Sequence, residues 1–87
     1  MNAPVLVRMT KIAGKEDSSY PIGATREGPA WNEPKIGENY ALDGYIKTSL
    51  NERFHWFRTT EVKGIAVIPG GHTVISTTNS QWRIDKI

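Results

Sequence analysis

The chain has 87 residues, and its 11 Lys and Arg residues against 9 Asp and Glu residues give a formal net charge of +2. A chain this short forms one domain, residues 1–87, with a thin core, which excludes a deep enclosed active site. The absence of cysteine excludes disulfides and cysteine-based zinc sites. No segment reaches the roughly 20 apolar residues of a membrane span, and the first residues do not form a secretory signal. We therefore expect a cytoplasmic protein without a membrane partner.

The positive charge is concentrated in the second half of the chain. Residues 1–44 hold five basic and six acidic residues, a net charge of −1, whereas residues 45–87 hold six basic and three acidic residues, a net charge of +3. A domain that binds nucleic acid is usually more basic overall than this one. The asymmetry is a hint of a nucleic-acid partner and not a signature of one.

Helical periodicity is nearly absent, and the short runs of β-branched and aromatic residues between turn residues are typical of an all-β protein. A first strand is predicted over residues 4–12, where side chains alternate in polarity, and a weak strand over residues 20–27. The segment "EGPAWNEPKIGEN", residues 27–39, holds two prolines and two glycines. It is predicted as a long irregular connection, which Trp31 fixes onto the body of the protein.

In the middle of the chain, Asp43-Gly44 is typical of a two-residue type I′ turn. It predicts a β-hairpin whose arms are residues 40–42 and 45–48. A turn is predicted at residues 48–51, and a strand at residues 52–60. That strand carries the aromatic side chains on which the functional argument depends.

The C-terminal part is predicted as a hairpin followed by a last strand. Residues 62–68 and 73–78 form the arms, and Pro69-Gly70-Gly71 joins them, because proline favours the first central position of a turn and glycine accepts positive φ. After a bend, Trp82 and Ile84 point to the same side of the last strand. The sequence therefore predicts five to seven short antiparallel strands in a small single-domain β-barrel, similar in size to SH3-like or OB-like domains.

The predicted strand in the middle of the chain has aromatic side chains on both faces. Alternation places Phe54 and Trp56 on one face, and Arg53, His55 and Phe57 on the other. Burying one such aromatic side chain contributes roughly 1.5–3 kcal/mol, so Phe54 and Trp56 together have the stronger tendency to enter the core. We therefore expect the other three side chains to point to solvent.

Three interpretations of this exposed face stay open. In the first, Phe57 lies under the irregular connection, against Trp31. In the second, Arg53, His55 and Phe57 form a protein-binding surface with the Trp31 loop, because aromatic and Arg residues are enriched at binding hot spots. In the third, the same residues bind single-stranded nucleic acid by stacking on bases, with help from the basic side chains of Lys47, Arg58 and Lys63.

No catalytic or metal-binding pattern is present. Pro69-Gly70-Gly71-His72 fits no phosphate-binding loop, because neither Lys-Ser nor Lys-Thr nor a helix follows it. We expect His72 to be an exposed turn residue. His55 lies 17 residues from His72, without the spacing of metal ligands. Carboxylates are scattered, and no serine lies in a nucleophile elbow. We expect no enzymatic activity, no cofactor and no metal.

Two short motifs flank the predicted C-terminal hairpin: "RTTEV" at residues 58–62 and "TTNSQW" at residues 77–82. The pair resembles the ending of many short phage and prophage proteins, in which R-T-[ST]-x-V is followed by T-x-N-S-x-[YW]. Thr60 replaces the usual Ser, and Trp82 replaces the usual Tyr. Residues 27–40 are similar to the middle section of those proteins, so the resemblance covers residues 27–87. It implies an accessory protein of a mobile element that acts inside a bacterial cell. Proteins of that origin often bind and block host proteins, including components of antiviral defence.

The second motif also has a structural interpretation, which we favour over a ligand site. Asn79 tolerates positive φ better than most residues, and Ser80 is able to bond the backbone of the same bend. Arg58 would hold this bend against the middle strand. The motif would then close the barrel.

The leading functional hypothesis is a non-catalytic binding module of phage or prophage type that inhibits or redirects a host bacterial protein. The alternative is a single-stranded nucleic-acid-binding barrel. A third hypothesis, capture of a small nucleotide in a barrel-mouth or subunit-interface pocket, has no phosphate loop to support it. A homo-oligomer is also expected, because the core is thin and open edge strands pair readily.

Overall fold

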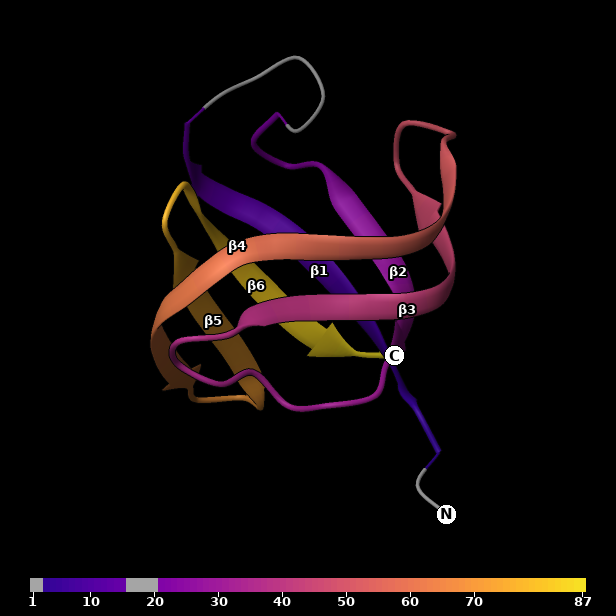
Figure 1. Ribbon diagram of the computed structural model, residues 1–87. Helices are drawn as coiled ribbons and strands as arrows, with labels where there is room; N and C mark the ends of the chain where they lie inside the picture. The colour runs from indigo at the N-terminus through magenta and orange to yellow at the C-terminus, as the bar shows by residue number, and fades with distance from the viewer. Residues whose placement is uncertain (1–2, 16–20) are drawn as a thin grey trace.

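Six antiparallel strands closed into a barrel make up the described part of the chain, residues 3–15 and 21–87, in the computed structural model (Figure 1). Each strand pairs with the next one, and the last strand pairs with the first. The predicted fold class, a small antiparallel all-β barrel, is therefore confirmed. The strands are β1 (Val5–Gly14), β2 (Thr25–Ala30), β3 (Asn39–Thr48), β4 (Arg53–Ile68), β5 (His72–Thr77) and β6 (Ser80–Lys86).

The barrel closes through the pairing of β1 with β6, two strands from opposite ends of the described chain. Their register runs from Val7 opposite Lys86 to Gly14 opposite Ser80. In Figure 1, β3 and β4 cross in front of β1, β2 and β6. Together, β3 and β4 form one wall of the barrel, and their outer face points to solvent.

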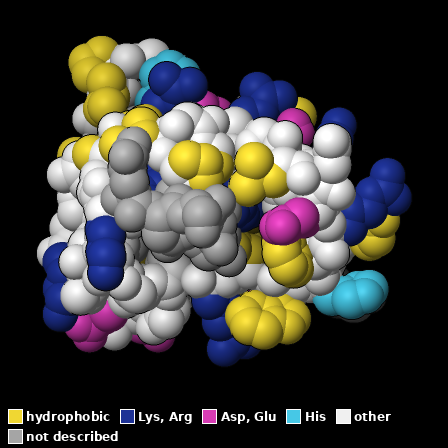
Figure 2. Space-filling view, turned by 90° about the horizontal axis from the view of Figure 1, so that it is seen from above, with side chains coloured by type: hydrophobic (Ala, Val, Ile, Leu, Met, Phe, Trp, Pro, Cys, Tyr) yellow, Lys and Arg dark blue, Asp and Glu magenta, His cyan; other side chains and the backbone are white. Residues whose placement is uncertain are grey.

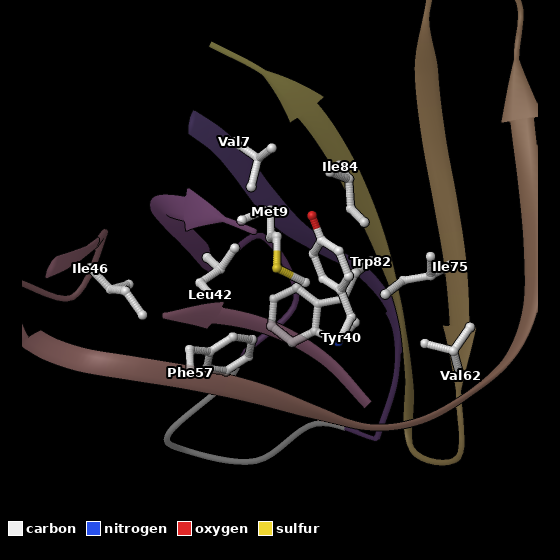
Figure 3. Packing of buried hydrophobic residues seen from close by; sticks show 11 residues of the cluster. Val7, Met9, Tyr40, Leu42, Ile46, Phe57, Val62, Ile75, Trp82 and Ile84 are labelled. Carbon is white, nitrogen blue, oxygen red and sulfur yellow. The ribbon is translucent and has the colours of Figure 1, made fainter. Parts of the chain in front are cut away.

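Alternating side chains of the strands fill the barrel. Leu42 on β3 and Phe57 on β4 are direct partners, and both point inward. Phe57 packs edge-on against Trp82 of β6, with 5.5 Å between the ring centroids. Trp82 and Ile84 lie on the same side of β6, as predicted, and both are buried. Figure 3 shows the buried cluster between the strands, which comprises Val7, Met9, Ala30, Tyr40, Leu42, Ile46, Phe57, Val62, Ile75, Trp82 and Ile84.

The predicted hairpin at Asp43-Gly44 is wrong, because β3 runs through these two residues without a turn. The pairing with β4 shifts between Asp43 and Ile46, which marks a β-bulge. Gly44 has a φ of 140° there, and a Cβ atom on it would lie 2.6 Å from Cγ of Pro29. The glycine is required by a close approach of β2 to β3 and not by a turn.

The turns on both sides of β4 were predicted correctly. Between β3 and β4, Asn51 donates its N–H to the carbonyl of Thr48 and adopts a φ of 61°. Between β4 and β5, Gly70 and Gly71 have φ values of 102° and 87°. The two segments predicted as separate strands between these turns form one strand of 16 residues, β4.

The region before β3 is more regular than predicted. The irregular connection was expected to begin at Glu27, yet Glu27 to Ala30 belong to β2. Pro29 fits into this strand because β2 pairs with β3 only through Arg26 and Glu27. Pro29 therefore lies at an edge position, where a missing N–H is tolerated. The weak strand predicted over residues 20–27 overlaps β2, and its first residue, Tyr20, lies outside the described residues.

Within the described ranges no helix is long and apolar enough to cross a membrane.

Candidate binding surface on strands β3 and β4

The first half of β4 is oriented opposite to the prediction. Phe57 is 7% exposed and belongs to the core, whereas Trp56 is 63% exposed and Phe54 is also exposed. The prediction that Phe54 and Trp56 enter the core is therefore wrong. Phe57 lies opposite Leu42, an inward side chain of β3, so alternation turns Trp56 and Arg58 outward.

Phe57 also contacts the buried side chain of Arg26. The Arg26 guanidinium carbon lies 5.3 Å from the centroid of the Phe57 ring, a cation–π distance. Because Phe57 lies between Arg26 and Trp82 inside the barrel, its side chain is not part of the exposed surface, contrary to the prediction. Its predicted place on the exposed surface is taken by other aromatic side chains of β3 and β4.

Tyr45, Arg53 and His55 form a connected group on the β3–β4 hairpin. Arg53 donates a hydrogen bond from Nη1 to the Tyr45 hydroxyl oxygen at 2.6 Å, and its guanidinium carbon lies 5.5 Å from the Tyr45 ring centroid. The Tyr45 and His55 rings are 6.4 Å apart and nearly perpendicular, at 73°. Tyr45 remains 57% exposed. These contacts restrict the rotamers of long side chains while leaving their surfaces accessible.

Trp56, Arg58 and Trp31 continue this surface. The Arg58 guanidinium carbon lies 5.9 Å from a Trp56 ring centroid. Trp31 is 52% exposed, and its indole Nε1–H donates to the Asp43 carbonyl at 3.1 Å. The connection before β3 is thus tied to β3 through Trp31, as the sequence suggested.

Two adjacent hollows join these side chains into one surface. One is lined by Asp43, His55, Trp56 and Arg58, and the other includes Trp31 together with Asp43 and Arg58. We call the whole region the aromatic–arginine surface, and it consists of Trp31, Tyr45, Arg53, Phe54, His55, Trp56 and Arg58.

The two predicted lysines occupy different places. Lys47 is exposed on β3 opposite Arg53 and adjoins the aromatic–arginine surface. Lys63 forms an ion pair with Glu61. It lies ten residues further along β4 than Arg53, and it lines neither of the two hollows. The structure therefore does not bring Lys63 to the other predicted site residues.

The surface is only weakly basic. The hairpin from residue 39 to residue 58 holds three basic residues against Asp43 and Glu52, a net charge of +1. Both carboxylates belong to exposed residues. The surface therefore combines aromatic rings with charges of both signs.

The two sequence motifs flanking the β4–β5 hairpin lie side by side, because Val62 pairs with Thr77 and the Thr78 N–H donates to the Glu61 carbonyl at 3.2 Å. In the bend, Thr77 Oγ1 accepts from the Ser80 N–H at 3.2 Å and donates to the Ser80 carbonyl at 3.0 Å. Between described residues, the side-chain hydrogen bonds within the bend are thus made by Thr77, whereas the prediction gave this role to Ser80.

Two further details of that predicted bend are wrong. Among the described residues other than glycine, Asn51 has a positive φ, and Asn79 does not. The Arg58 guanidinium lies over Trp56, and no hydrogen bond among the described residues joins it to the bend.

Two ionisable residues outside the surface have shifted pKa values. Burial, reinforced by the negative charge of Glu33, raises the pKa of Tyr40 to about 12. Partial burial acts to raise the pKa of Asp85, but hydrogen bonds and charges from His72 and Arg83 outweigh it and lower that pKa. His72 is the first residue of β5, and its Nδ1 is hydrogen-bonded to Asp85 Oδ1, so its prediction as a simple exposed turn residue is wrong. Nowhere in residues 3–15 and 21–87 do three metal-ligating side chains cluster.

The sequence analysis missed Tyr45, Phe54 and Trp56 as surface residues. Their types were a signal, because large aromatic residues are typical of hot spots. The obstacle for Phe54 and Trp56 was the prediction that their face of the strand enters the core, and Tyr45 was assigned only to a short hairpin arm.

The fold and the surface define a class, namely a six-stranded closed β-barrel with an exposed aromatic–arginine surface on β3 and β4. Comparison with known proteins finds no match among family models, curated proteins or solved structures. The function is therefore argued from the chemistry of the surface.

Proposed function

We propose that the protein is a non-catalytic binding module of phage or prophage type, which binds a host bacterial protein and inhibits or redirects it. The observation that carries this proposal is the exposed group of aromatic side chains held by arginines on β3 and β4, above all Trp56 and Tyr45. The phage or prophage origin rests on the resemblance of the two C-terminal motifs.

The residue types of the surface favour a protein partner. Trp, Tyr and Arg dominate the binding energy of protein interfaces, each fitting a pocket on the partner. Arg53 is already bonded to Tyr45, and Tyr45 already contacts His55. Side chains that are ordered before binding lose less entropy when the complex forms.

Single-stranded nucleic acid is the second candidate partner. Arg53 and Arg58 each lie over an aromatic ring. Aromatic rings and arginine guanidinium groups both stack on the bases of single strands. The carboxylates of Asp43 and Glu52 in the same hairpin argue against it, because they reduce the attraction to phosphates.

The test begins with capture of partners from a bacterial lysate, with and without nuclease, using the wild type and Trp56→Ala. Val67→Ala is the control variant, because Val67 is 77% exposed on β4 and lies outside the aromatic–arginine surface. The captured protein is then purified, and its affinity and its own activity are measured directly.

We expect Trp56→Ala to weaken the purified complex about 30-fold, the effect of a 2 kcal/mol hot-spot residue, and Val67→Ala to leave it unchanged. We also expect the wild type to change the activity of the partner. A complex that disappears with nuclease, and whose affinity falls steeply with salt, would support the nucleic-acid candidate instead. Equal effects of both variants would contradict a site at this surface.

A further inference from the structure

The two ends of the barrel differ in character. Figure 2 looks onto the end where β1 finishes and β5 turns into β6, and Lys and Arg side chains stand around that rim. The opposite end, which the connection from β2 to β3 crosses in Figure 1, contains a cavity of about 350 Å³. We call this cavity the apolar mouth. Its lining includes Val5, Val7, Tyr40, Ile65, Thr73 and Ile84.

The apolar mouth continues the core of the barrel outwards. Val5 lies two residues before the buried Val7 on β1, so alternation points both side chains to the inside. Val5 is nonetheless 45% exposed, and Ile65 of β4 is 40% exposed. These two side chains are therefore accessible to a ligand, unlike the buried residues below them. Accessible apolar walls around a few polar groups are typical of small-molecule sites.

Tyr40 supplies a buried hydroxyl at the floor of the apolar mouth. Figure 3 shows its hydroxyl oxygen directed towards Val7 and Ile84, which also line the cavity. Tyr40 is 5% exposed, and its backbone N–H donates to Thr59 Oγ1. Its hydroxyl forms no hydrogen bond with another residue of the described ranges. Because an apolar environment makes an unpaired hydroxyl costly, a ligand that offers an acceptor at this point gains a hydrogen bond.

The charges around the apolar mouth favour a neutral ligand. The charged residues of the described lining are Glu33 and Lys86, both exposed and of opposite sign. Their charges oppose each other, and moving a charged ligand from water into an apolar cavity costs free energy. Burial, reinforced by the negative charge of Glu33, raises the pKa of Tyr40 to about 12. The hydroxyl therefore keeps its proton at neutral pH and acts as a donor.

The size and polarity of the apolar mouth match a small molecule better than a segment of a protein chain. Each residue of a bound segment brings a backbone carbonyl and usually an N–H, and both need partners. The side chains of Val5 and Ile65 offer no such partner. The volume lies at the lower end of the range for small-molecule sites, which fits a ligand with one ring and one polar substituent.

We propose that the apolar mouth binds a small, uncharged and largely apolar molecule that carries one hydrogen-bond acceptor, such as a carbonyl oxygen. The Tyr40 hydroxyl donates to that acceptor, and Val5 and Ile65 pack against the apolar part. This activity is separate from binding of a host protein by the aromatic–arginine surface. Trp31 lines the apolar mouth and also belongs to that surface, so no test variant is placed there.

The experiment is titration of the isotope-labelled protein with acetophenone, a neutral aromatic ketone, followed by NMR. Toluene lacks the acceptor, benzoate is an anion and benzylammonium is a cation, so these compounds test each property of the ligand separately. Tyr40→Phe removes the hydroxyl and keeps the ring. Ile65→Trp fills the apolar mouth. Ile68→Trp is its matched control, because Ile68 is 42% exposed on the same strand and does not line the cavity.

We expect acetophenone to shift the amide signals of Val5, Ile65 and Ile84, and to bind at least tenfold more tightly than benzoate or benzylammonium. Tyr40→Phe should weaken acetophenone binding about fivefold, the effect of losing one neutral hydrogen bond, and leave toluene binding unchanged. Ile65→Trp should abolish binding of both compounds, whereas Ile68→Trp should leave it unchanged. Thermal unfolding of every variant checks that the fold is retained, and Tyr40→Phe keeps the test decisive if Ile65→Trp does not fold.

Three results would overturn the proposal. The first is absence of saturable shifts with acetophenone and toluene at millimolar concentrations. The second is an equal effect of a variant and its control, either of Tyr40→Phe on acetophenone and toluene or of the two tryptophan variants on acetophenone. The third is tighter binding of benzoate or benzylammonium than of acetophenone, which would show that a charged group is recognised. None of these results bears on the binding of a host protein, which Trp56→Ala tests.

Discussion

Replacing Phe57 by alanine tests the orientation of β4, on which the whole surface argument depends. Phe57 is 7% exposed and packs edge-on against Trp82. Truncation of a buried Phe costs about 3–5 kcal/mol, and loss of the aromatic pair places this site in the middle of that range, at about 4 kcal/mol. Trp56→Ala is the control from the opposite face. It should cost less than about 1 kcal/mol, because Trp56 is 63% exposed and an exposed cation–π contact is weak.

The assay is urea unfolding followed by far-ultraviolet circular dichroism, which does not depend on the removed tryptophan. A domain of this size has a total stability of roughly 4–13 kcal/mol. With a denaturant slope of about 2 kcal/mol per molar urea, Phe57→Ala should lower the midpoint by about 2 M or leave the protein unfolded. Trp56→Ala should lower it by no more than about 0.5 M. A larger loss in Trp56→Ala than in Phe57→Ala would refute the orientation of β4.

Three further predictions concern stability. Tyr40 has a pKa of about 12 in the fold against about 10 when unfolded. The free energy of unfolding should therefore fall by about 1.4 kcal/mol per pH unit between pH 10 and 12. In urea titrations, Tyr40→Phe should remove this slope. The lowered pKa of Asp85 contributes stability above its unfolded value near 4, and this stability is lost as the pH falls through the folded value. Asp85→Asn should therefore cost roughly 1 kcal/mol of stability at pH 7, and this cost should shrink as the pH falls below 4. A cost that does not change with pH would contradict the pairing with His72 and Arg83. Gly44→Ala should lower the stability by about 1–3 kcal/mol, because of its φ and the contact with Pro29; an unchanged melting temperature would show that the bulge relaxes.

The parts of the fold that local chemistry determines were predictable from the sequence. Pro69-Gly70-Gly71 forms a turn because the residue types themselves supply the required φ values. Trp82 and Ile84 point inward because their strand alternates between apolar and polar residues. In both cases the information lies within a few neighbouring residues.

The errors occurred where a distant residue decides the local structure. Asp43-Gly44 has the sequence of a turn, but Gly44 serves the contact with Pro29, a residue of another strand. The orientation of β4 was ambiguous for a similar reason, since both faces carry aromatic residues. Only the register that sets Phe57 opposite Leu42 resolves it.

The candidate surface was therefore found in part. Arg53 and His55 are exposed, as the sequence analysis expected, and Arg58 and Trp31, which its binding hypotheses also used, are exposed as well. The central aromatic residue was predicted as Phe57, and the structure places Trp56 there instead. Aromatic residues on both faces of a strand indicate that the strand carries an exposed surface, but they do not indicate which of the two faces is exposed.

The pairing of β1 with β6 has a consequence for how the chain folds during synthesis. Val7 and Lys86 are 79 positions apart, so β1 leaves the ribosome long before its second partner exists. Until then, β1 and β5 are the unpaired edges of an incomplete sheet, and such edges readily pair with other chains. Contacts of this long range also form slowly. We therefore expect ribosome-bound chains that end before β6 to be prone to aggregation, and β6 to be the segment whose emergence makes the nascent protein resistant to proteases.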